Sequence, residues 1–196
     1  MKKFLLAAIL MLAPLAPIGA QDKDPAAGRA PTRDRVDDAI DKAVKYLVSA
    51  QGKDGEISER QHTQTAMTSL AILAMASVGN QPTDETPAGQ AMKKALAYVL
   101  RSDRQDPQGY LGGKDGSRMY GHGIITLMLS EMLGMGVDAQ MDQLIRERCR
   151  LAVQLILRSQ SVQKDERSKG GWRYQPDSRD SDLSITVWQV MALRSA

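Results

Sequence analysis

The feature that most constrains this chain is a threefold internal repeat. The segments Ala43–Gln51, Ala95–Asp103 and Ala152–Gln160 align without gaps, at offsets of 52 and 57 residues. Each segment is followed by a glycine turn and then by a second apolar run; these runs begin near Ala66, Gly123 and Ser184. A unit of this kind cannot bury its apolar faces alone, so stacked neighbours must bury them. The sequence therefore predicts three units, each a helix, a glycine loop and a second helix.

The two helices of each unit differ in their apolar pattern. In the first helix of the first unit, Val36, Ile40 and Leu47 share one face, which is typical of a helix with one exposed side. The second helices are apolar nearly all round, since residues 66–78 and 123–130 contain no charge. We expect an inner layer of enclosed helices and an outer layer of amphipathic ones, in an all-helical fold. An ordinary six-helix bundle is the alternative.

Methionines recur in the apolar runs, and they bear on how the inner layer is packed. Met67, Met75, Met128 and Met191 all fall in the predicted inner helices. Methionine is flexible and fills irregular gaps in cores. We therefore expect these four side chains to be core filler.

The first 33 residues are predicted to lie outside this fold. Residues 1–20 carry two lysines, a short apolar run, Pro14 and the small-residue end Gly19-Ala20, the pattern of a secretory signal cleaved after Ala20. A membrane anchor is the alternative, but the run is too short to cross ~30 Å of hydrocarbon. Residues 21–33 predict a solvated linker, and residues 34–196 the repeat domain. We expect export, to the periplasm or the medium.

Charge and cysteine content exclude several classes of partner. The chain has 26 basic and 23 acidic side chains, and without Lys2 and Lys3 the balance is 24 against 23, or +1. Such a chain offers no electrostatic case for binding nucleic acid. One cysteine excludes an internal disulfide, and we expect Cys149 to be buried and inert. Two histidines without ligand spacing predict no metal and no cofactor.

The third glycine loop carries a family resemblance. The run 170–177, followed by 180–188, resembles the terpenoid cyclase/protein prenyltransferase superfamily, and especially the prenyltransferase and squalene oxidase repeat of squalene-hopene cyclases. Gln160 ahead of Gly171 and Trp172 resembles their glutamine–tryptophan signature, with a longer spacer. The likeness covers about residues 34–196. It implies an (α/α) toroid of six hairpins around a cavity, of which this chain supplies three.

Two expectations about the third unit follow from that resemblance. Residues 193–196 stop inside an apolar helical run, so we expect a truncated reading frame with a missing C-terminal half, or a half-ring that needs a partner. Gln160, Gly170, Gly171 and Trp172 form a structural turn, with Trp172 packed between neighbouring hairpins.

The resemblance also points to candidate catalytic residues. Squalene-hopene cyclases protonate a polyene with an Asp-x-Asp-Asp-Thr motif; here Asp180 matches its first position and Asp182 its proton donor, while Leu183 and Ser184 depart from it. A carboxylic acid stays protonated through burial or a like-charged neighbour, and a helix N-terminus favours the ionised form. Without the adjacent carboxylate, we expect Asp182 to cap its helix rather than to donate a proton.

Three further residues are candidates for lining the inner cavity. Trp188 lies on an inner helix, Tyr120 lies at the mouth of another, and His122 precedes that second helix. Carbocation chemistry needs aromatic faces, and residues 21–196 contain no phenylalanine, which makes a poor lining. An imidazole near Asp182 would suit acid–base work, and a capping or packing role for His122 is the alternative.

Together these patterns predict an exported, non-catalytic repeat protein that binds or scaffolds through its inner cavity or the adjacent loops. The ligand is unidentified, and the resemblance implies an apolar or isoprenoid molecule. The alternative is a terpenoid cyclase-like isomerase, or a fragment of one, with Asp182 as proton donor helped by Asp180.

Overall fold

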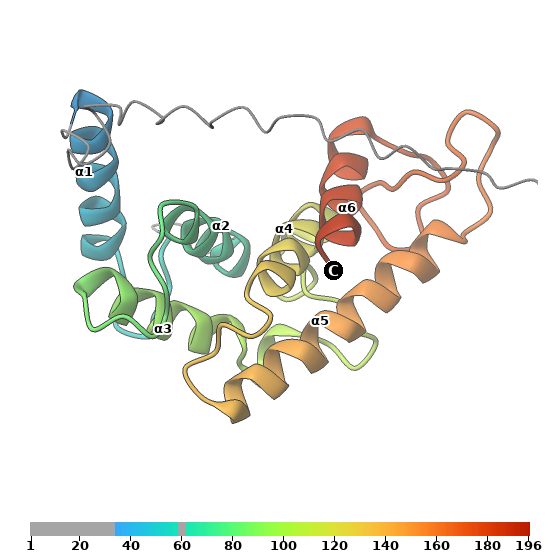
Figure 1. The fold of residues 1–196 in the computed structure, drawn as a ribbon. Helices are drawn as coiled ribbons and strands as arrows, with labels where there is room; N and C mark the ends of the chain where they lie inside the picture. The colour runs from blue at the N-terminus through green and yellow to red at the C-terminus, as the bar shows by residue number, and fades with distance from the viewer. Residues whose placement is uncertain (1–33, 59–61) are drawn as a thin grey trace, which may run out of the picture. The chain divides into compact units, whose positions relative to one another are not determined.

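The computed structural model describes residues 34–58 and 62–196, so the predicted signal and linker lie outside the described residues. Within this part, Arg35–Ala196 forms one unit that is entirely helical (Figure 1). Its helices are α1 (Arg35–Ser49), α2 (Gln64–Ser77), α3 (Pro87–Val99), α4 (Arg118–Glu131), α5 (Ala139–Gln160) and α6 (Leu183–Ser195), with a 3₁₀ turn η1 (Ser102–Arg104). Extended pairing among the described residues is a single bridge between Gln51 and Ile57. The prediction of an all-α fold is confirmed.

Helices α3, α5 and α6 each start at a residue whose side chain caps the helix. Thr86 caps α3, its hydroxyl accepting the N–H of Gly89 at 3.1 Å, and Pro87 follows at the first helical position. Helix α4, in contrast, begins at Arg118, well before the apolar run that starts near Gly123. His122 therefore lies inside α4, and the prediction that it precedes this helix is wrong. Tyr120 lies in the first turn of α4.

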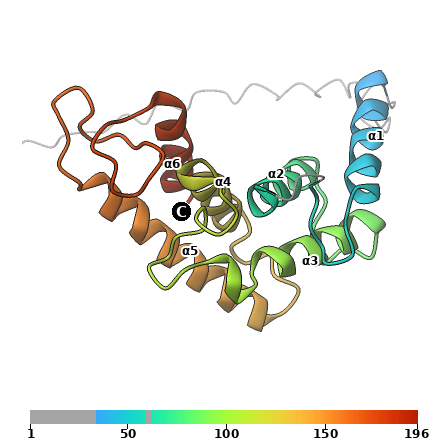
Figure 2. The ribbon, with the colours of Figure 1, turned by 180° about the vertical axis from the view of Figure 1, so that it is seen from behind.

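The second helices of the three units pack side by side, with α4 between α2 and α6 (Figures 1 and 2). Gly123 allows the close approach of α6, because a Cβ atom there would lie 2.5 Å from Nε2 of Gln189. Helix α4 is buried along most of its length, as predicted. Helices α2 and α6 are not enclosed. Among the described residues, each of them packs against another second helix, α4, on one side only.

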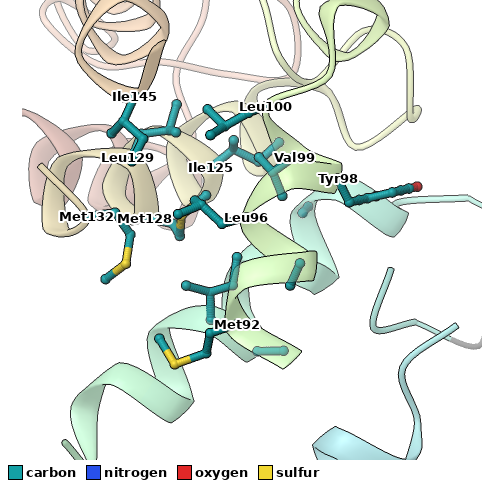
Figure 3. Close-up of a cluster of buried hydrophobic side chains, with 14 of the residues drawn as sticks. Met92, Leu96, Tyr98, Val99, Leu100, Ile125, Met128, Leu129, Met132 and Ile145 are labelled. Carbon is teal, nitrogen blue, oxygen red and sulfur yellow. The ribbon is translucent and has the colours of Figure 1, made fainter. Parts of the chain in front are cut away.

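Apolar side chains gather in two clusters. In the first, Met92 and Leu96 of α3 meet Ile125 and Met128 of α4 and Ile145 of α5 (Figure 3). The second joins α4, α5 and α6 and contains Met119, Leu127, Leu155, Ile156, Trp172, Ile185 and Ala192. Met75 and Met128 are core residues as predicted, but Met67 and Met191 are 45% and 44% exposed, so that prediction is wrong for both.

Cys149 belongs to the first cluster and is buried and free. Burial raises the pKa of its thiol. The predicted burial of Cys149 is confirmed, and a raised pKa disfavours the thiolate, which is the reactive form. No helix in the described part of the chain combines the length and hydropathy needed to cross a membrane.

After α1 and after α3, a glutamine ties the following glycine loop to the next helix of the set α1, α3 and α5. Nε2 of Gln51 donates to the carbonyl of Gly55 at 3.1 Å and to that of Ala91, in α3, at 2.8 Å. Nε2 of Gln105 donates in the same way to Gly109 and to Arg148, in α5, both at 3.0 Å. The gapless alignment placed Asp103 at this position. The 3₁₀ turn η1 shifts the glutamine further along the chain.

The glycines of these loops touch the backbone of the helix that receives them. A Cβ atom at Gly55 would lie 2.5 Å from the carbonyl oxygen of Lys94, and one at Gly109 would overlap the carbonyl of Leu151. Both glycines also have a positive φ, 101° and 96°. Glycine is therefore required at each of these positions for two reasons, the positive φ and the close contact with the backbone of the next helix.

Comparing Gly109→Ala with Gly134→Ala separates the effect of the backbone contact from that of the positive φ. Gly134 is the matched control, because its φ is 78° and nothing lies within 4 Å of its Cβ position. We expect Gly109→Ala to lower the free energy of unfolding by about 1–3 kcal/mol more than Gly134→Ala, since only Gly109 adds a clash with backbone to the strain of positive φ. Urea unfolding of both variants measures the difference. Equal losses would contradict the contact with Leu151.

Candidate functional site

His122, a candidate cavity residue, is fully buried in α4 and bonded on both ring nitrogens. Nδ1 accepts the N–H of Leu111 at 3.3 Å, and Nε2 lies 3.2 Å from the carbonyl of Ala152 and donates to it. Burial lowers the pKa of His122 to about 4. The imidazole is therefore neutral at pH 7, and backbone groups rather than Asp182 occupy its nitrogens.

The bond from Leu111 to His122 has a counterpart in each of the other units. The N–H of Ile57 donates to Thr68 Oγ1 at 2.9 Å, and the N–H of Trp172 donates to Thr186 Oγ1 at 3.1 Å. In all three units, a buried residue two positions after the loop glycine bonds to a side chain of the following inner helix. His122 thus occupies a structural repeat position. The shared separation of 11 residues in the first two units is a signal that sequence reasoning missed.

Asp182 caps α6, as the sequence predicts. Its carboxylate accepts the N–H groups of Ser184 at 3.0 Å and Ile185 at 3.1 Å. The hydroxyl of Ser184 also donates to it, and the phenol of Tyr120 donates to Ser184. Tyr120 and Asp182 are thereby linked through Ser184, where α4 and α6 begin.

These hydrogen bonds decide the protonation of Asp182. The bond from the Ser184 hydroxyl, followed by that from the Ile185 N–H, lowers the pKa of Asp182 below its ordinary value. Donors that stabilise the charged form keep a carboxyl ionised at neutral pH. Asp182 is therefore an anionic helix cap and a poor proton donor.

Asp180 does not assist Asp182 in the way a catalytic pair requires. Its carboxylate is exposed and lies 3.1 Å from Nη1 of Arg173, whose guanidinium also stacks over the ring of Tyr174. A like-charged neighbour raises a pKa only when it is close and unpaired. The charge of Asp180 is neutralised by Arg173 instead.

The predicted structural turn is held by a hydrogen bond and by close packing. Gln160 donates through Nε2 to the carbonyl of Gly170 at 3.1 Å, which repeats the first half of the bonding of Gln51 and Gln105. Gly171 packs against Ser181, where a Cβ atom would lie 2.6 Å away. These contacts hold the loop that presents Trp172.

Trp172 is buried, and it connects three helices. Its indole N–H donates to the carbonyl of Ile156, in α5, at 2.9 Å, while its backbone carbonyl accepts the N–H of Asp182 at 2.8 Å. The second cluster adds Met119 and Leu127 of α4, from the preceding hairpin. Half-buried Trp188 and Tyr120 pack on the edge of the same cluster.

Two apolar grooves lie along the inner helices, and neither is lined by Tyr120, His122 or Trp188. The first, which we name the methionine groove, has a volume of 410 Å³ between α2, α4 and α6. It is lined by Leu73, Ala76, Ser77, Leu127, Glu131, Met132, Met135 and Met191. Sequence reasoning missed this groove because it assigned Met191 to the core.

The second groove, the α1–α2 cleft, has a volume of 440 Å³. It is lined by Tyr46, Leu47, Ala50, Ile57, Ser58, Met67, Leu70, Ala71 and Ala74. Its walls come from one outer helix and one inner helix of the same hairpin.

Comparisons with known proteins returned no match: no family model, no curated protein and no solved structure matches this chain. In residues 34–58 and 62–196, no group of three or more His, Cys, Asp or Glu side chains is arranged to hold a metal ion.

Proposed function

We propose that this is an exported, non-catalytic protein related to the squalene cyclase-like repeat proteins, whose three hairpins form half of an (α/α) toroid. Its function is to bind an apolar ligand, of isoprenoid type, in the methionine groove. The proposal of export rests on the signal pattern of residues 1–20. The observation that carries the proposed binding function is the lining of the groove.

The lining suits an apolar molecule of variable shape. Met132, Met135 and Met191 contribute flexible thioether side chains, and Glu131 is the single charged residue on the wall. Methionines adapt to ligands that lack a fixed outline, which is why they are common at permissive binding surfaces. Concave apolar sites with few polar groups are the usual form of small-molecule sites.

The ionised state of Asp182 favours binding over catalysis. A cyclase needs a strong acid beside its substrate, whereas Asp182 is ionised and satisfied by the donors at the start of α6. It is also absent from the lining of the methionine groove. The cyclase-like alternative therefore has no observation in its favour.

Binding of the neutral dye Nile red, with the isoprenoid alcohol farnesol as competitor, tests the proposal. We expect a blue-shifted dye fluorescence that farnesol reverses. Met191→Glu should weaken both ligands at least about tenfold, because it places a charge against apolar ligand atoms. Fluorescence titration of both variants against the wild type gives the dissociation constants.

Met67→Glu is the matched control, since Met67 is exposed to nearly the same extent but lines the α1–α2 cleft. It should leave Nile red affinity unchanged. Equal weakening by both variants, or absence of binding to the wild-type protein, would contradict the proposed site. Turnover of a polyprenyl substrate that disappears in Asp182→Asn would favour the cyclase-like alternative.

A further inference from the structure

At each junction inside the chain, an outer helix is covered by two parts of the preceding hairpin. Helix α3 is covered by α2 and by the Gly55 loop, and α5 by α4 and by the Gly109 loop. The covered face has the same form both times: Ala95 and Tyr98 in α3, and Ala152 and Leu155 in α5, are all buried. The same type of contact between hairpins therefore occurs at both internal junctions.

The α1 end presents this face without a cover among the described residues. In the repeat alignment, Ala43 and Tyr46 correspond to Ala95 and Tyr98. Ala43 is exposed, and Tyr46 is 60% exposed whereas Tyr98 is 3% exposed. Beside them lies the α1–α2 cleft, at the place where an inner helix of a preceding hairpin would pack.

At the α6 end, no complementary outer helix lies among the described residues. Val187 and Val190 follow Thr186 by one and four residues, as Ser69 and Ile72 follow Thr68. Ser69 and Ile72 are buried, whereas Val187 and Val190 are 45% and 52% exposed. The face of α2 that carries Ser69 and Ile72 is thus covered, while the corresponding face of α6 is exposed.

The third glycine loop is open in the same way. Gly170 has a φ of 82° and accepts the bond from Gln160, like Gly55 and Gly109 with their glutamines. Yet no described atom lies within 4 Å of its Cβ position. The loop has the form that receives an outer helix, and no described helix lies on it.

We infer that the protein self-associates head to tail, with the α6 end of one copy docked on the α1 end of a second copy. The register follows from the two internal junctions. Gln160 donates to the carbonyl of Ala39, as Gln51 does to Ala91, and Gly170 rests on the carbonyl of Lys42, as Gly55 does on Lys94. Val187 and Val190 enter the α1–α2 cleft.

The occupant is a second copy because both halves of the contact are on this chain. In Figures 1 and 2, α1 and α6 lie at opposite ends of the helical unit, so one copy cannot join its own ends. A contact between unlike surfaces of identical chains is heterologous, and it either closes into a ring or continues as a filament. This inference is independent of the proposed ligand.

Sedimentation velocity of the full-length protein tests the assembly, with Gly170→Ala as the diagnostic variant. We expect the wild-type mass to rise with concentration above the mass of a single chain. Gly170→Ala should weaken association at least tenfold, because its Cβ is free in the single copy but meets Lys42 in the junction. Gly134→Ala, which shares the positive φ and the open surroundings, should associate like the wild type. The inference is overturned if the wild-type protein stays monomeric, which is the result expected if the α6 end receives a further hairpin of a longer chain. Equal association of the Gly170→Ala and Gly134→Ala variants also overturns it.

Cross-linking then tests which ends meet. Lys42→Cys and Lys169→Cys are prepared separately and joined with a short bismaleimide, while buried Cys149 stays in both. We expect cross-linked dimers from the mixture and little from either variant alone. Equal cross-linking within one variant would mean that like ends pair, which overturns the head-to-tail contact.

Discussion

Trp172→Ala is expected to lower the free energy of unfolding by about 3–5 kcal/mol, the usual cost of removing a buried tryptophan. The side chain is 2% exposed and fills the second cluster between α4, α5 and α6. Its loss leaves a cavity and also leaves the carbonyl of Ile156 without its indole donor. Urea denaturation followed by circular dichroism measures the change.

Two further variants identify the cause. Trp172→Phe keeps most of the apolar volume and loses the bond to Ile156, so we expect a loss between that of the alanine variant and zero. Trp188→Ala removes the same side-chain type from a half-buried position and should cost clearly less. If Trp172→Ala and Trp188→Ala were equally destabilising, the central position of Trp172 would be refuted.

Acid should destabilise the protein through His122. The unfolded chain takes up a proton at the ordinary histidine pKa of 6.5, while the folded protein does so only at about 4. A depressed histidine pKa contributes stability that is complete above pH 6.5 and falls as the pH drops toward 4. The shift corresponds to about 3 kcal/mol between these limits. Unfolding measured from pH 7 to pH 4 follows the loss.

His122→Gln isolates this contribution, because glutamine offers one acceptor and one donor and does not titrate. We expect the variant to be less stable than the wild type at pH 7 and to lose less stability on acidification. His62→Gln is the control, since His62 is exposed and should leave the profile unchanged. Parallel wild-type and His122→Gln profiles would show that the buried imidazole does not control the acid response.

Much of the candidate site was predictable from local chemistry. Asp182 precedes an apolar run with a serine after it, and that pattern alone favours a capped and ionised carboxylate, as the structure has it. Trp172 follows two glycines, which place it at the start of a close-packed turn. His122 was misjudged because the start of α4 carries no capping side-chain bond, so nothing in the sequence marks Arg118 as its first residue.

The sequence by itself determined that the chain is helical and where helices such as α3 and α6 begin, because periodicity and caps act within one or two turns. Only the tertiary structure decided which apolar faces are covered. Ser69 and Val187 stand at equivalent positions, yet one is buried and the other open. Described neighbours bury Ser69 and leave Val187 exposed, so the burial of a side chain depends on its neighbours rather than on the helix that carries it.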